Sequence, residues 1–135
     1  MRALLLPVHG EWYGLPLDAV REVVPDPELT RLPLAPPSLL GVFNLRGQVV
    51  PLVDTGALLG LEPLRGGPYV TVALHGGSLV GLVSDGAPET AVLAEQVGQG
   101  KLPGTGALHA SGERVVSMLD VGALVAAERL AAAGA

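Results

Sequence analysis

Residues 49–59 read Val-Val-Pro-Leu-Val-Asp-Thr-Gly-Ala-Leu-Leu, and residues 115–125 read Val-Val-Ser-Met-Leu-Asp-Val-Gly-Ala-Leu-Val. In both stretches an apolar run ends at an aspartate, and Gly-Ala-Leu follows after one more residue. Two further blocks recur in the same order. Val-His-Gly at 8–10 returns as Leu-His-Gly at 74–76, and the Gly, Leu, Asp and Glu of 14–22 return at 81–89. Collinear matches at a nearly constant spacing along the chain indicate an internal duplication.

The duplication divides the chain into halves at about residues 1–66 and 67–130. A chain of 135 residues is within the range of one ordinary domain. Each half is long enough to close a small barrel of about five strands, but alone it would bury only a marginal fraction of its surface. We therefore expect residues 1–135 to form a single domain in which the two halves pack against each other.

Glycine and proline punctuate the chain as expected for many short strands. The 19 glycines and 12 prolines are spread evenly, and they separate apolar runs of about four to eight residues. Several runs are bracketed by pairs that suit hairpin turns with positive φ: His9-Gly10, Arg46-Gly47, Gly76-Gly77 and Ser111-Gly112. The pattern predicts an all-β fold of the barrel class.

Asp54 and Asp120 occupy matching places in the two halves, each just before the repeated Gly-Ala-Leu unit. An aspartate at the start of a helix accepts hydrogen bonds from free backbone N–H groups and faces the positive end of the helix dipole. We therefore assign both residues to N-capping rather than catalysis. The sequence predicts short helices over 55–60 and 121–130.

The composition excludes several classes of function. Without cysteine the chain has no disulfide, thiolate nucleophile or sulfur ligand, which is typical of cytoplasmic proteins. A net charge of −5 disfavours binding to nucleic acid or an anionic membrane face. Apolar runs such as residues 3–6 are far shorter than the roughly 20 residues that span a bilayer, so we expect no membrane insertion. The apolar content of 49% fits either a dense core or an exposed patch for protein partners.

No arrangement of residues points to an enzyme. His9 and His75 lie in corresponding predicted turns, and His109 has no carboxylates at ligand spacing, so we expect no metal site. No serine sits in a Gly-x-Ser-x-Gly elbow. The glycine-rich pieces 98–100 and 104–106 lack a Walker lysine. We expect neither a cofactor nor a catalytic reaction.

Residues 29–33 read Leu-Thr-Arg-Leu-Pro, and residues 39–54 read Leu-Leu-Gly-Val-Phe-Asn-Leu-Arg-Gly-Gln-Val-Val-Pro-Leu-Val-Asp. This stretch resembles the central signature of the CheW-like family, and the resemblance extends over residues 3 to 127. It implies two SH3-like five-stranded β-barrels. It also implies a chemotaxis adaptor that binds the regulatory domain of a CheA-type histidine kinase and the cytoplasmic tip of a methyl-accepting chemoreceptor.

Two alternatives stay open at this point. One is a CheW-like adaptor of a pathway that controls pili or a second messenger rather than flagella. The other is a small-molecule-binding β-barrel, for which we would expect a polar triad or a cluster of ligand-binding residues.

The resemblance also assigns the partner-binding positions, which are Val20, Glu22, Gly41, Arg46, Tyr69 and Thr90. It implies that Glu22 and Arg46 form a surface charge pair near the receptor and kinase contacts. Arginine presents a fork of donors that matches a carboxylate geometrically. We expect Val20, Gly41 and Arg46 to border a groove between the barrels that takes a receptor helix, with Gly41 allowing close approach of the partner's backbone. Thr90 departs from the usual aliphatic residue, and the segment 101–112 is shorter than the family pattern.

Overall fold

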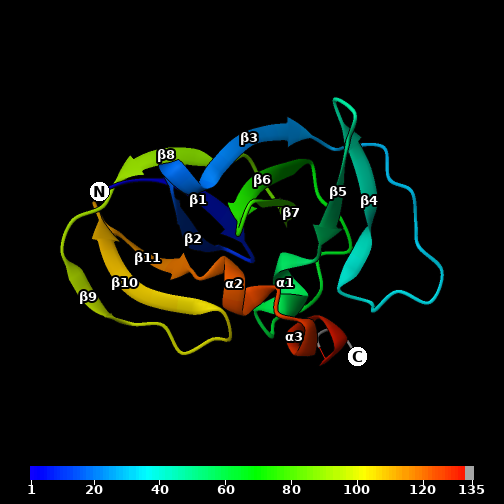
Figure 1. The fold of residues 1–135 in the computed structure, drawn as a ribbon. Helices are drawn as coiled ribbons and strands as arrows, with labels where there is room; N and C mark the ends of the chain where they lie inside the picture. Colours follow the sequence, from blue (N-terminus) through cyan, green and yellow to red (C-terminus); the bar gives the residue numbers. More distant parts are fainter. Residues whose placement is uncertain (133–135) are drawn as a thin grey trace.

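The computed structural model of the protein describes residues 1–132, which form two β-sheets with short helices beside them (Figure 1). Sheet A has the strand order β8-β1-β2-β11-β10-β9, and sheet B has the order β3-β6-β7-β5-β4. The strands of sheet A are β1 (Arg2–Val8), β2 (Glu11–Pro16), β8 (Glu89–Val92), β9 (Gln96–Gln99), β10 (Thr105–Ser111) and β11 (Arg114–Leu119). The strands of sheet B are β3 (Val20–Pro25), β4 (Leu39–Leu45), β5 (Gln48–Val53), β6 (Tyr69–His75) and β7 (Ser78–Ser84).

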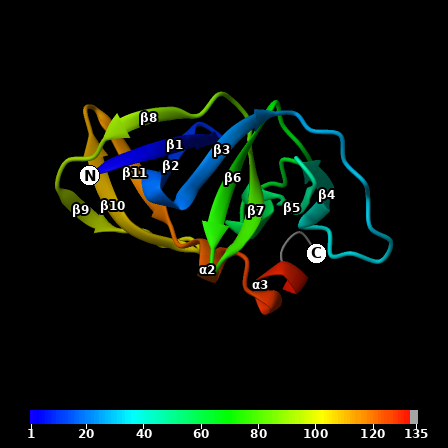
Figure 2. The same ribbon diagram turned by 45° about the horizontal axis from the view of Figure 1, so that its top comes forward.

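The two halves of the sequence exchange their first hairpins. The β1–β2 hairpin of the first half lies in sheet A among strands of the second half, and β6–β7 of the second half lies in sheet B (Figure 2). Parallel pairings of β2 with β11 and of β5 with β7 hold the exchanged hairpins in place. The two barrels therefore do not coincide with the two sequence halves, because each sheet takes its central hairpin from the other half.

Sheet A has six strands and sheet B five, and alignment of the two repeats shows which strand is additional. When the two repeats are aligned, strands β3, β6, β7, β5 and β4 correspond to β8, β1, β2, β11 and β10 in the same sheet order. The extra strand of sheet A is β9, which pairs with β10. In sheet B the corresponding place holds a single bridge between Thr30 and Val42.

The tight turns agree with the sequence prediction at three of the four pairs. Positive φ angles occur at His9-Gly10 (50° and 80°), Arg46-Gly47 (49° and 88°) and Gly76-Gly77 (56° and 80°). These are the conformations that match the twist of two-residue hairpins. In the fourth hairpin Ser111 is still in β10, and Gly112 supplies the positive φ of 61°.

The two predicted caps are confirmed, although the helices are shorter than expected. Asp54 accepts a hydrogen bond from the Ala57 N–H at 3.1 Å, and Asp120 accepts one from the Ala123 N–H at 3.1 Å. The helices after them are α1 (Thr55–Leu58) and α2 (Val121–Leu124), and a separate α3 (Ala127–Ala132) follows. Gly60, with φ 79°, follows the end of α1 as glycine commonly does.

The largest apolar core joins the two sheets. It combines Leu6 and Leu15 of sheet A with Val53 and Leu82 of sheet B, and Leu58 of α1 packs into the same cluster. All five side chains are nearly or fully buried. The remaining short helix, η1 (Leu17–Ala19), connects β2 of sheet A with β3 of sheet B. Among the described residues no helix is long and apolar enough to cross a membrane.

Candidate protein-binding site

Glu22 and Arg46 form a forked ion pair on sheet B. One guanidinium nitrogen of Arg46 donates to Glu22 Oε2 at 3.2 Å, and the other donates to Glu22 Oε1. Glu22 lies on β3 and Arg46 in the turn that follows β4, and β3 and β4 are the two outer strands of the sheet. The pair therefore links the two edges of sheet B.

The local sequence explains why Arg46 protrudes. Arg46 and Gly47 are the two central residues of the hairpin turn between β4 and β5, and the Gly47 N–H donates to Asn44 Oδ1 at 2.7 Å. A left-handed backbone is uncommon for a residue other than glycine, but this turn type requires it at both positions. The turn holds the arginine at the tip of a hairpin, where the side chain is 69% exposed, whereas that of Glu22 is 27% exposed.

The pair keeps both side chains charged. The hydrogen bond from Arg46 lowers the pKa of Glu22 below its ordinary value, and the positive charges of Arg46 and Arg21 act in the same direction. The hydrogen bond to Glu22 raises the pKa of Arg46. A fixed carboxylate thus orients an exposed guanidinium, which retains donors for a carboxylate or carbonyl of a partner.

The other predicted positions are more widely spread. Val20 and Tyr69 lie at opposite ends of the β3–β6 ladder, where Val20 pairs with Ala73 and Tyr69 pairs with Pro25. Val20 packs partly against the core between the sheets, and Tyr69 is 37% exposed. Thr90 is exposed on β8, an edge strand of sheet A. The structure brings Glu22 and Arg46 together and leaves Thr90 on the other sheet.

The reason for glycine at position 41 differs from the one expected. Gly41 is buried, and a Cβ added there would lie 2.7 Å from the Thr30 carbonyl oxygen. Its φ of 153° is also one that side chains rarely adopt. The backbone that approaches Gly41 closely is therefore the chain's own segment at Thr30 and Arg31, so the expectation of a partner's backbone there is corrected.

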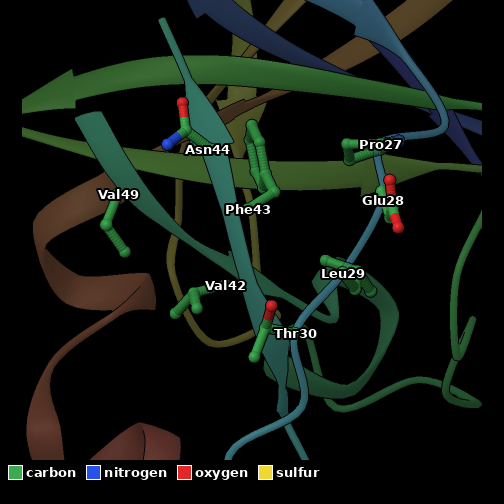
Figure 3. Close-up of a pocket in the computed structure, with 8 residues that line it drawn as sticks. All are labelled: Pro27, Glu28, Leu29, Thr30, Val42, Phe43, Asn44 and Val49. Atoms are coloured by element: carbon green, nitrogen blue, oxygen red, sulfur yellow. The ribbon is translucent and has the colours of Figure 1, made fainter. Parts of the chain in front are cut away.

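A hollow of about 470 Å³ lies beside the Arg46 turn (Figure 3). It is lined by residues of β4, of β5 and of the loop before β4: Pro27, Glu28, Leu29, Thr30, Val42, Phe43, Asn44 and Val49. At its closed end Thr30 and Val42 exchange two backbone hydrogen bonds of 2.8 and 2.9 Å. Beyond this bridge the loop diverges from β4, as Figure 3 shows between Glu28 and Asn44. Sequence reasoning missed the hollow, although Pro25 and Pro27 are residues that interrupt strand pairing.

Sequence reasoning also missed a second charge pair, which Arg114 forms with Glu89. Arg114, the first residue of β11, donates to Glu89 at the start of β8, and its guanidinium lies 4.6 Å from the centre of the Trp12 ring. Glu89 is the counterpart of Glu22 in the duplication. The repeat could have indicated this carboxylate, but not its partner, because Arg114 corresponds to Gln48 rather than to Arg46.

The predicted groove between the barrels stays a prediction. An apolar hollow of about 250 Å³ lies between sheet B and the chain after β11, and it is lined by Leu39, Pro51, Val53, His75, Ser78, Leu79, Val80, Val125 and Leu130. Neither this hollow nor the one beside the Arg46 turn includes Val20, Gly41 or Arg46 in its lining.

A family model described as a CheW-like domain matches residues 2–129, nearly the whole chain. The chain belongs to the CheW-like family. This confirms the resemblance seen in residues 29–54, and with it the role of a chemotaxis coupling adaptor.

Individual relatives agree with this assignment. The chemotaxis protein CheW of Klebsiella aerogenes is 30% identical over 141 aligned positions, which cover 95% of this chain and 83% of that protein. Protein PilI of Pseudomonas aeruginosa is 36% identical over 78 positions, covering 56% of this chain and 44% of PilI. The crystal structure of the scaffolding protein TtCheW from Thermoanaerobacter tengcongensis aligns with a TM-score of 0.76 and 21% identity over 87% of both chains. That structural similarity confirms the predicted fold of two SH3-like barrels, with β9 as an additional strand of sheet A.

Proposed function

We propose that this CheW-like protein joins the regulatory domain of a CheA-type histidine kinase to the cytoplasmic tip of a methyl-accepting chemoreceptor, by non-covalent binding and without a reaction of its own. The observation that carries the proposal is the oriented Arg46–Glu22 pair at the tip of the β4–β5 hairpin. An exposed, oriented guanidinium gives geometric specificity to a protein contact. Such a contact needs no cofactor, and within residues 1–132 no three His, Cys, Asp or Glu side chains gather as a metal site would require.

The other four predicted partner-binding residues are given different roles, depending on whether their side chains are exposed. Tyr69, at the start of β6, and Thr90, on β8, present accessible side chains to a partner. We assign Val20 and Gly41 an indirect part, because Val20 packs partly on the core and Gly41 contacts the chain's own backbone. In this proposal they set the position of β3, which carries Glu22, and of β4, which leads into the Arg46 turn.

The choice of pathway is a second question. The similarity to PilI, 36% over 78 residues, favours a non-flagellar pathway that controls pili as the alternative. Both versions share the same mechanism of simultaneous binding. They differ in which kinase binds, so affinities for the CheA-type kinases encoded by the same organism would separate them.

The charge reversal Arg46→Glu tests the proposal. It places a second carboxylate beside Glu22 and removes the exposed donors, so we expect the affinity for the kinase regulatory domain or the receptor tip to fall by about tenfold or more. The thermal midpoint should stay nearly unchanged because the pair is exposed. Isothermal titration and a reconstituted kinase assay measure the effect.

Arg114→Glu is the matched control, since Arg114 is also a hairpin arginine paired with a glutamate, but on sheet A. We expect it to alter both affinities much less than Arg46→Glu. Equal affinities for the wild type and Arg46→Glu would show that Arg46 has no part in binding. Absence of binding by the wild type to either partner would contradict the proposed function as a whole.

A further inference from the structure

The hollow beside the Arg46 turn borders an incomplete strand edge. Thr30 and Val42 exchange backbone hydrogen bonds across this edge, so the N–H and C=O of Val42 point away from β5. In an antiparallel strand these groups alternate between the two sides, and those of Asn44, two residues later, therefore point the same way. In a continued ladder Glu28 would face Asn44. Instead the loop diverges, and within residues 1–132 no backbone group outside the β4–β5 pair bonds to Asn44.

Sheet A shows what fills the equivalent place. In the duplication Asn44 corresponds to Ala110 of β10. Both backbone groups of Ala110 are bonded to an extended segment: its carbonyl accepts from the Ala94 N–H at 2.8 Å, and its N–H donates to the Glu95 carbonyl at 3.2 Å. The segment continues as β9, where Gly98 pairs with Leu108, the counterpart of Val42. The same edge is thus covered by an extended backbone in one sheet and open in the other.

We propose that the open edge of β4 at Asn44 is a docking site for an extended segment of a partner protein, which adds to sheet B as a strand. This inference goes beyond the coupling function, which involves the Arg46 turn, because it assigns a different binding mode to a neighbouring surface. Strand addition to an exposed edge is a common mode of peptide recognition, in which backbone hydrogen bonds supply affinity and side-chain pockets supply specificity.

The lining of the hollow indicates the kind of segment that fits. Val49 is 66% exposed at the rim, and Val42 and Leu29 are partly buried, so the site favours an apolar side chain. Glu28 is the charged residue of the lining and is exposed, so it favours a basic neighbour in the same segment. The partner segment is therefore an extended strand that carries an apolar and a basic residue.

The chain's own loop does not complete this edge. Pro27 has no N–H to donate, and the residues from Pro27 to Leu29 are outside any strand. Since the loop leaves a space of about 470 Å³ between itself and β4, an incoming strand does not need to displace a paired segment.

A peptide from the chain's own β9 region provides a defined probe. We would titrate isotope-labelled full-length protein with a synthetic peptide of residues 91–99, Ala-Val-Leu-Ala-Glu-Gln-Val-Gly-Gln, and with a version that has lysine in place of Glu95. At millimolar peptide we expect the NMR signal of the Asn44 amide to shift and its hydrogen exchange to slow by about tenfold. The lysine version should bind more tightly, and Glu28→Gln should remove that preference.

Two substitutions at one position separate the backbone contact from the side chain. Asn44→Pro removes the N–H that faces the hollow and is not used in the β4–β5 ladder, whereas Asn44→Ala keeps it. Both lose the side-chain bond to Gly47. We expect Asn44→Pro to abolish peptide binding and Asn44→Ala to retain it within about threefold.

An unchanged Asn44 amide at saturating peptide, or equal binding by the two variants, would overturn the proposal of strand addition. So would shifts confined to β9 and β10, which would mean that the peptide only replaces the chain's own strand. These outcomes do not depend on the kinase or receptor. Loss of partner binding in Arg46→Glu together with an unresponsive Asn44 would support the coupling function while rejecting strand addition.

Discussion

At the scale of single residues, the same backbone conformation has different consequences for two exposed side chains. Arg46 and Leu34 both have a left-handed backbone, with φ angles of 49° and 61°. For Arg46 the hairpin turn requires it, and the result is an oriented guanidinium. Leu34 lies in the loop before β4, is completely exposed, and has no burial to offset its strain. The two residues therefore respond differently to substitution.

Replacing Leu34 should stabilise the protein. Asparagine tolerates the left-handed region better than leucine does, so Leu34→Asn should raise the free energy of unfolding by about 0.5–1 kcal/mol. Denaturant unfolding measures the change. Leu32→Asn is the control, because Leu32 is in the same loop, is 42% exposed, and has an ordinary φ. Equal effects of the two substitutions would assign the gain to lost surface hydrophobicity rather than to relieved strain.

The Glu22–Arg46 pair should give a small pH-dependent contribution to stability. The pKa of Glu22 is lowered from 4.5 in the folded protein, so the unfolded chain binds its proton more readily. The contribution is therefore fully present above pH 4.5 and is lost as the pH falls through the folded pKa. The difference in thermal midpoint between the wild type and Glu22→Gln should be constant from about pH 6 to 8 and should shrink below about pH 4. A difference that grows on acidification would contradict this sign.

At the scale of elements, the two halves carry the same cap but use it differently. Asp54 is buried and accepts three backbone N–H groups, those of Ala57, Leu64 and Arg65, at 2.7 to 3.1 Å. It therefore fixes both the start of α1 and the loop that leads to β6. Asp120 is exposed and accepts one bond, from Ala123. The sequence signal was the same in both halves, and only the packed structure separates a local cap from a buried anchor.

The matched substitutions Asp54→Ala and Asp120→Ala should reveal this difference. Asp120→Ala loses a single cap, which typically costs about 1 kcal/mol. Asp54→Ala leaves three donors without their acceptor, one buried and two partly buried, so we expect a loss of about 2–4 kcal/mol in the free energy of unfolding. Chemical denaturation of the two variants measures the contrast. Similar losses would mean that the bonds to Leu64 and Arg65 contribute little.

Element positions could be predicted from the sequence because their causes are local. Glycine at a turn, an aspartate before Gly-Ala-Leu and apolar runs of strand length each act over a few residues, and they predicted a chain of many short strands, three of four turn pairs and both caps. The prediction of a single helix over 121–130 was wrong, because α2 ends at Leu124 and a separate α3 begins at Ala127. Arg129 of α3 donates to the carbonyls of Leu58 and Ala57 at the end of α1. No local feature of the sequence indicates these two long-range hydrogen bonds.

At the scale of the whole molecule, the exchange of hairpins makes the two halves depend on each other. Sheet A needs β1–β2 from the first half, and sheet B needs β6–β7 from the second. Cutting the chain between the halves therefore splits both sheets. We propose that the chain unfolds as one cooperative unit, in keeping with the core that joins Leu6 and Leu15 to Val53 and Leu82.

Two fragments of nearly equal length test this. Residues 1–66 correspond to one sequence repeat, whereas residues 20–84 contain every strand of sheet B. We expect 1–66 to show no cooperative unfolding, because β1–β2 lacks β8 and β11, and β3–β5 lack β6–β7. Residues 20–84 should retain sheet structure with reduced stability, since their contacts with sheet A are missing. Circular dichroism during heating and dispersion of amide NMR signals measure both. Cooperative unfolding of 1–66 would contradict the exchange.

Local signals in the sequence were enough to predict an all-β chain, its duplication, its turns and caps, and, through the resemblance of residues 29–54, its family. Only the tertiary structure decided that the hairpins are exchanged, that Gly41 contacts Thr30, and that the edge at Asn44 is open while that at Ala110 is covered. The physical reason is that strand pairing across tens of residues depends on which buried surfaces fit together. Two repeats with nearly the same pattern can pair within themselves or with each other, and the choice lies in the packing of the whole core.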